Sequence, residues 1–225
     1  MTVRQLILSL GHRPAHGAAD FIVGASNREA MAWIDRWPEW PSGGLVLVGP
    51  PASGKSHLVA VWQARSHAAV VAAAALADSP DLVALARRGA VAVEDADRGV
   101  DERALLHLYN LMREHRGHVL LTARSAPARW RLALPDLRSR MATLPVAVLA
   151  PPDDDVLATL IVKLFADRQV RVEPDLVAYL VARLDRSFAV AADAVATLDA
   201  AALAQGRAVT IPLVKSVLGP SMTDK

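Results

Sequence analysis

The chain has 225 residues, of which 53% are hydrophobic, and its formal net charge is only +2. This composition is typical of a folded globular protein and excludes a disordered chain. The small basic excess does not indicate direct, sequence-specific DNA binding, which requires a clustered basic face. The lack of cysteine excludes disulfides, a thiolate nucleophile and a Cys-ligated zinc site.

No segment of the sequence predicts export or membrane insertion. The apolar stretch between Arg4 and Gly11 is too short for the core of a signal peptide. The longest apolar run, at residues 68–77, falls far below the ~20 residues that span a bilayer. We therefore expect a soluble, cytoplasmic protein with no membrane partner.

Short apolar runs alternate with helical patterns over the first two thirds of the chain. Helices are expected after the capping-box pattern Ser26–Glu29, from about Ser56, at 81–88 and at 101–116. Strands are expected at 45–48, 69–74, 90–93, 118–122 and 145–149. Because such an alternation is typical of parallel sheets covered on both faces, we predict an α/β fold with a parallel five-stranded sheet.

The pattern changes after Pro151 and Pro152. Strand patterns largely disappear, and helical patterns cover 153–168, 174–184, 187–205 and 212–218. The sequence therefore predicts a tail at 1–20, an α/β base at 21–150 and a small all-helical lid at 151–225.

A phosphate-binding motif lies between the first expected strand and its helix. The segment GPPASGKS matches G-x-x-x-x-G-K-S. The glycines allow the backbone to curl so that N–H groups point at phosphate oxygens, the lysine serves the β- and γ-phosphates, and the serine hydroxyl serves Mg²⁺. We predict that ADP or ATP, with Mg²⁺, binds at Gly49, Pro50, Pro51, Ala52, Ser53, Gly54, Lys55, Ser56 and His57.

Acidic residues follow the third expected strand. Glu94 and Asp95 are placed to hold Mg²⁺ through water and to orient an attacking water. Strand alternation predicts that they point to opposite sides, and it does not decide which one serves the metal. The alternative is that Asp95 or Asp97 only caps the following turn.

Two further polar positions allow both a functional and an ordinary interpretation. Thr122 ends the fourth expected strand, where its hydroxyl would lie between the nucleotide and the next strand, although an ordinary strand-end threonine fits equally well. Arg138 and Arg140 lie in the turn LPDLRSRM, where they suit either a transition-state clamp or, more commonly, a solvated surface pair.

The segments FIVGASN, GPPASGKSHL, VEDAD, LLTAR, LRSRM and TIPLVKSVL occur in this order. Over nearly the whole chain they resemble the AAA+ ATPases related to the replication initiator DnaA, and most of all the Hda-like regulators of that initiator. The resemblance implies an AAA+ base with a helical lid, acidic site positions at Glu94 and Asp95, and a sensor position at Thr122. It also implies that Phe21, Val23 and Gly24 flank the adenine. Arg140 matches the arginine finger that acts in trans on the ATP bound to DnaA.

The tail contains QLILSL, which resembles the peptide by which Hda-like proteins bind the DNA polymerase sliding clamp. In that interpretation Leu6, Leu8 and Leu10 enter an apolar groove while Gln5 bonds its rim. An edge strand packed on the protein's own sheet fits the same alternation. The chain also ends soon after the lid, so we expect no helix-turn-helix DNA-binding domain.

One position departs from the family pattern. Ala189 stands where the lid normally offers an arginine to the nucleotide, and Arg186, nearly one helical turn earlier, is a candidate substitute. We therefore expect a regulator with weak or no ATPase activity of its own, which binds the clamp and promotes hydrolysis of ATP on DnaA. The alternatives are a self-acting AAA+ ATPase of helicase-loader type and, less favoured, a small-molecule kinase. A homodimer is compatible with the sequence.

Overall fold

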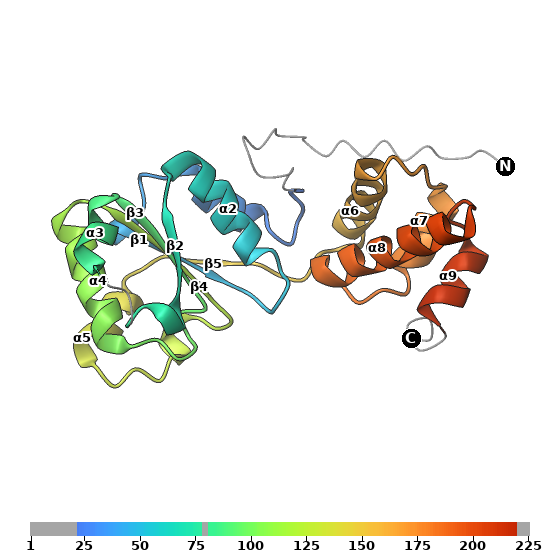
Figure 1. Ribbon diagram of the computed structural model, residues 1–225. Helices are drawn as coiled ribbons and strands as arrows, with labels where there is room; N and C mark the ends of the chain where they lie inside the picture. Colours follow the sequence, from blue (N-terminus) through green and yellow to red (C-terminus); the bar gives the residue numbers. More distant parts are fainter. Residues whose placement is uncertain (1–21, 78–80, 220–225) are drawn as a thin grey trace.

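A computed structural model describes residues 22–77 and 81–219 and shows an α/β base followed by a helical lid (Figure 1). The expectations for Phe21 and for Gln5, Leu6, Leu8 and Leu10 fall outside the described residues.

The base is built on five parallel strands in the order β2-β3-β4-β1-β5. Alternate residues of the central strand β1 enter two different cores: Leu45 and Leu47 on one face, Val46 and Val48 on the other. This double burial explains why the strands read as continuous apolar runs. The predicted parallel sheet is confirmed, with β1 at Gly44–Val48, β2 at Ala69–Ala72, β3 at Ala90–Glu94, β4 at His118–Ala123 and β5 at Val146–Val148.

Helices cover both faces of this sheet. Trp62 and Ile34 belong to the core on the side of α1 and α2, whereas Leu108 and Met141 belong to the core on the side of α4 and α5 (Figure 1). The helices of the base are α1 (Arg28–Asp35), α2 (Lys55–Ser66), α3 (Leu82–Arg87), α4 (Glu102–Glu114) and α5 (Pro135–Ala142). Short 3-10 turns lie at Pro41–Gly43, Ala73–Ala75 and Pro127–Arg129.

Helix α1 does not begin with the capping box that the sequence predicted. Asn27 is the N-cap, and its side chain turns away from the helix. Its Oδ1 accepts from the N–H of Gly24 at 2.9 Å, and its Nδ2 donates to the carbonyl of Ile22 at 2.9 Å. Ser26 Oγ is buried with no partner among the described residues. The amide of Asn27 therefore fixes the segment in front of the helix instead of the first helical turn.

The lid is a four-helix unit with a core of its own. Phe165, Leu180, Leu198 and Leu213 lie at its centre, one from each helix. The helices are α6 (Asp154–Asp167), α7 (Pro174–Val181), α8 (Phe188–Gln205) and α9 (Ile211–Leu218), as the sequence predicted. Among the described helices, α8 alone has the length and hydropathy of a membrane span, but five of its residues are buried in the lid core, so a packed core helix accounts for its composition.

The segment in front of α1 touches the lid. A Cβ atom added to Gly24 would lie 2.0 Å from Val156 Cγ2 and 3.4 Å from Asp153 Oδ2, both at the start of α6. The N–H of Ala150 also donates to the carbonyl of Ser26 at 2.9 Å, which fixes the connection between sheet and lid. Gly24 is therefore required by the close approach of α6.

Replacing Gly24 with alanine is expected to lower the free energy of unfolding by about 1–3 kcal/mol, because the new methyl group overlaps Val156. Urea denaturation measures the change. In a double-mutant cycle, Val156→Ala should relieve part of the loss, since it removes the methyl group that is in the way. Equal stabilities of Gly24→Ala and wild type would contradict the close approach.

Candidate functional site

The carboxyl ends of three neighbouring strands meet at one edge of the sheet. Val48 of β1 lies opposite Ala123 of β4, and Val93 of β3 lies opposite Leu121 of β4. The N–H of Gly49 donates to the carbonyl of Ala123 at 3.1 Å, which joins the loop after β1 to the end of β4. A hollow of about 220 Å³ opens there, lined by Pro51, Ala52, Lys55, Ser56, Glu94, Asp95, Thr122 and Arg124.

The loop after β1 has the backbone of an anion-binding loop. Ala52 and Gly54 have left-handed φ values of 56° and 96°. Gly49 is packed so closely that a Cβ there would lie 2.5 Å from the carbonyl oxygen of Leu149 and 2.7 Å from Ser53 Oγ. Since α2 begins directly after the loop, the N–H groups of its first turn have no acceptor within the helix. Such donors fit a phosphate group.

Lys55, the first residue of α2, is buried with 8% of its surface exposed. Its Nζ donates to the carbonyls of Gly49 at 2.8 Å and Pro50 at 2.7 Å. Burial lowers the pKa of Lys55; the carboxylate of Asp95 opposes this and the guanidinium of Arg124 adds to it. The ammonium group is thus poorly solvated and faces a second cation, an arrangement that an anion in the hollow would stabilise.

Glu94 and Asp95 both line the hollow, so the predicted divergence of these two side chains is wrong. Strand alternation stops at Glu94, the last residue of β3, because Asp95 adopts a left-handed backbone with φ 56°. The N–H of Asp95 donates to Thr122 Oγ1 at 3.0 Å, and the N–H of Ala96 donates to the carbonyl of Thr122 at 2.8 Å. Thr122, which is buried, therefore fixes the turn that brings the second carboxylate to the site.

Asp97 stabilises the backbone segment that follows β4, next to the site. Its Oδ2 accepts from the N–H groups of Arg124 at 2.9 Å and Ser125 at 3.0 Å, and from Ser125 Oγ at 3.2 Å. The alternative that this acid caps the turn following it is wrong for Asp97, because its Oδ1 has no partner among the described residues and its Oδ2 holds the segment that follows β4.

The site offers oxygen ligands of the kind that Mg²⁺ prefers. Ser56 supplies a hydroxyl, and Glu94 and Asp95 supply carboxylates around the same hollow. The described residues contain no group of three or more His, Cys, Asp and Glu able to form a complete metal site. Magnesium bound with a nucleotide needs only one or two carboxylates, because phosphates and waters complete its octahedron. The residues present therefore fit a magnesium–nucleotide complex.

The remaining candidate residues lie outside the lining of the hollow. Gly49, Pro50, Ser53, Gly54 and His57 build the loop and the start of α2. Val23 and Gly24 precede α1, where Gly24 meets α6.

The arginines that the sequence singled out also lie elsewhere. Arg140 lies on α5, where its Nε is 3.1 Å from Asp136 Oδ1 on the surface. The Nη2 of Arg186 lies 3.0 Å from Asp154 Oδ1, within the lid. Arg186 is therefore not positioned at the hollow as a substitute for the arginine missing at Ala189.

The sequence patterns predict no role for Arg124, the last residue of the segment LLTAR. Arg124 directly follows β4 and lines the hollow. Its role could have been predicted from its position two residues after Thr122, at the carboxyl end of a central strand.

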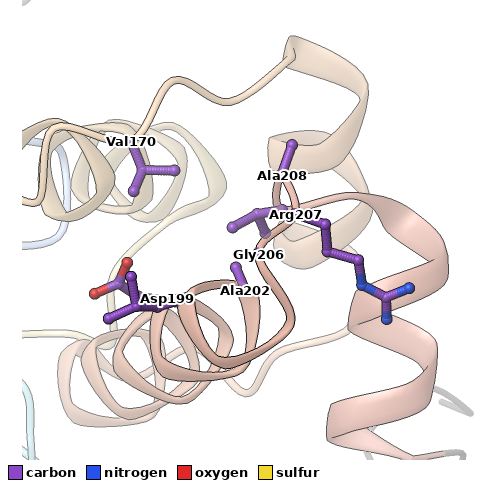
Figure 2. A pocket seen from close by; sticks show the side chains of 8 residues that line it. Val170, Asp199, Ala202, Gly206, Arg207 and Ala208 are labelled. Carbon is purple, nitrogen blue, oxygen red and sulfur yellow. The ribbon is translucent and has the colours of Figure 1, made fainter.

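A second hollow, of about 350 Å³, lies within the lid (Figure 2). Figure 2 shows Arg207 pointing away from Asp199 and Val170. Asp199 is already paired with Arg168, with Nε and Oδ2 3.6 Å apart. The lid hollow thus lacks the converging polar groups of a phosphate site, which makes the sheet edge the candidate functional site.

Comparison with known proteins identifies the lid and the fold. The family model described as "Hda, lid domain" matches residues 153–218. Domain III of the Thermotoga maritima replication initiation protein DnaA superposes with a TM-score of 0.76 at 16% identity, covering 91% of this chain and 95% of that chain. AMPPCP-bound DnaA from Aquifex aeolicus gives a TM-score of 0.63 at 15% identity, covering 78% of this chain and 62% of that chain.

A third similar structure is the Thermotoga maritima RuvB Holliday junction branch migration motor. It gives a TM-score of 0.67 at 16% identity, covering 85% of this chain and 65% of that chain. DnaA and RuvB share the AAA+ fold, so this fold is confirmed for the chain.

Because the pKa of Lys55 is lowered, the nucleotide affinity of the site is expected to depend on pH. A bound polyphosphate favours the charged ammonium and raises its pKa again, so that binding takes up a proton. The affinity for ADP is therefore expected to fall, by up to about tenfold per pH unit, as the pH rises through the lowered pKa. Titration of ADP over an alkaline pH series measures this fall. Lys55→Arg should abolish the dependence, since a guanidinium stays charged; a profile unchanged in Lys55→Arg would assign it to another group.

Proposed function

We propose that this chain, which has the AAA+ fold and a lid that matches the Hda lid model, is a DnaA-related, nucleotide-bound regulator of replication initiation that acts on DnaA. The observation that carries the proposal is the hollow at the sheet edge, where a phosphate-binding loop, a buried lysine and two carboxylates meet. The DnaA structure with bound AMPPCP shows that this fold holds an adenine nucleotide in a related protein.

The residues of the site divide the work of holding ADP or ATP. The loop N–H groups and Lys55 bind the phosphates, while Ser56, with Glu94 or Asp95, holds Mg²⁺, which neutralises phosphate charge when bound. Phe21, Val23 and Gly24 flank the adenine. The contact between Gly24 and α6 supports this arrangement, because it brings that segment to the junction of base and lid.

Arg140 is proposed to act in trans on ATP bound to DnaA. It lies on α5, which is anchored to the core through Leu137 and Met141. Glu102 of α4 holds the start of this helix by accepting from the N–H groups of Ala133 at 2.9 Å and Leu134 at 2.7 Å.

The side chain of Arg140 is 39% exposed, and its partner Asp136 is 55% exposed. A surface ion pair of this kind is weak, so a phosphate of a neighbouring subunit can replace the carboxylate. The guanidinium would then stabilise the charge that develops on the transferred phosphoryl group.

The proposal assigns little ATP turnover to the protein itself. Ala189 offers no charge to the nucleotide, and Arg186 is paired with Asp154. Such a protein would hold its nucleotide as a structural ligand. A self-acting ATPase is the competing function, and it predicts turnover by the isolated protein that Lys55→Ala abolishes.

The sliding clamp is proposed as a second partner on the sequence of the tail alone. Gln5, Leu6, Leu8 and Leu10 would dock on the DNA polymerase sliding clamp in the cytoplasm, and the clamp would bring the protein to DnaA. Direct recognition of a DNA sequence is no part of this proposal, and homodimerisation is compatible with it.

Arg140→Ala is expected to reduce the stimulated hydrolysis of ATP on DnaA by about 10³-fold or more, the effect of losing an arginine finger. Phosphate release in a reaction containing DnaA, the DNA-loaded clamp and this protein measures it. Arg138→Ala, an exposed arginine on the same helix, is the control and should retain stimulation. Undiminished stimulation by Arg140→Ala would refute the proposed role.

Replacing Gln5 and Leu6 together with alanine is expected to abolish capture of the protein by immobilised sliding clamp, because the peptide then loses its rim hydrogen bond and one apolar anchor. Nucleotide binding should be unaffected, since both changes lie in the tail. Clamp capture equal to that of wild type would show that the tail is not the docking peptide.

A further inference from the structure

A second cation, Arg124, lies beside Lys55 at the hollow. It is exposed and follows β4 directly. Among the described residues its guanidinium forms no ion pair or side-chain hydrogen bond. Within the described part of the chain no carboxylate is paired directly with Arg124, although Glu94 and Asp95 line the same hollow.

The backbone of Arg124 is held in place although its side chain is free. Its N–H donates to Asp97 Oδ2 at 2.9 Å. The preceding residue, Ala123, accepts from the N–H of Gly49 at 3.1 Å. The Cα of Arg124 is therefore fixed close to the first residue of the phosphate-binding loop, so that only the side chain must be ordered by a ligand.

Two positive groups at this hollow, beside the carboxylates of Glu94 and Asp95 that suit Mg²⁺, fit an anion bound together with that metal. Burial is the main reason that the pKa of Lys55 is lowered. The carboxylate of Asp95 raises this pKa, and the positive charge of Arg124, a smaller effect, lowers it. Repulsion between two cations is unfavourable unless an anion lies between them. A planar guanidinium binds two phosphate oxygens at once, a geometry that a lysine does not offer.

The lid supplies no comparable charge to this hollow. All residues that line it belong to the base, and Arg186 of the lid is paired with Asp154. We propose that Arg124 is a ligand of the terminal phosphate of a bound nucleoside triphosphate and contributes in cis the positive charge that the lid does not provide. This inference rests on the proposed nucleotide-binding function.

Equilibrium binding of AMPPCP with Mg²⁺, a non-hydrolysable analogue of ATP, tests the assignment. Arg124→Ala is expected to bind it about tenfold more weakly, the loss of one charge-assisted contact. Arg124→Lys, which keeps the charge without the planar fork, should lose about threefold. The matched control is Arg131→Ala, an exposed arginine in the same segment that does not line the hollow, and its affinity should be that of wild type.

Adenosine, which has no phosphate, serves as the second ligand. Its affinity should be the same in all four proteins, because Arg124 acts only on phosphate. Equal AMPPCP affinities for Arg124→Ala and Arg131→Ala would overturn the inference and leave the proposed function intact. A parallel loss for adenosine and AMPPCP would also overturn it. If wild type binds ADP but not AMPPCP, the inference is overturned while the proposed function stands; if it binds neither nucleotide, both fall.

Discussion

The parallel pairing of β4 with β1 on one side and with β3 on the other sets the position of the groups at the candidate site. Parallel strands carry their carboxyl ends to one edge, and the register places Val48 opposite Ala123. The bond from the N–H of Gly49 to the carbonyl of Ala123 extends that register into the phosphate-binding loop. Because this edge is fixed by strands buried on both faces, the site inherits the rigidity of the core.

The site concentrates groups that are individually unfavourable in a protein interior. Lys55 is largely buried, and Ser53 Oγ is buried with no partner among the described residues. Burying a charge or an unpaired polar group lowers stability, and groups of this kind are found most often at sites that bind ligands. Strain is present as well, because Ala52 and Asp95 both have positive φ values. The same features would favour a charged phosphate in the hollow, as the proposed function requires.

The candidate site and α5, the helix that carries the proposed arginine finger Arg140, are connected through the turns that follow β3. Asp97 holds the first residues after β4, and Glu102 holds the start of α5. Both ends of the segment from 124 to 134 are therefore bound by carboxylates from the stretch between 97 and 102. This arrangement connects Arg124, at the hollow, to α5, the helix that carries Arg140. The position of α5 therefore depends on the packing of the segment that lines the hollow.

The sequence by itself determined the parallel sheet, the helical lid and the place of the loop with the phosphate-binding motif, because these follow from local periodicity and from a motif whose residues are adjacent in the chain. The tertiary structure alone decided that Glu94 and Asp95 share one hollow, since a left-handed residue after β3 ends the strand alternation. It also decided that Asp97 is structural, that Arg186 is engaged by Asp154 and that Arg124 joins Lys55. These outcomes depend on strand register and on contacts between residues far apart in the sequence, which no local pattern encodes.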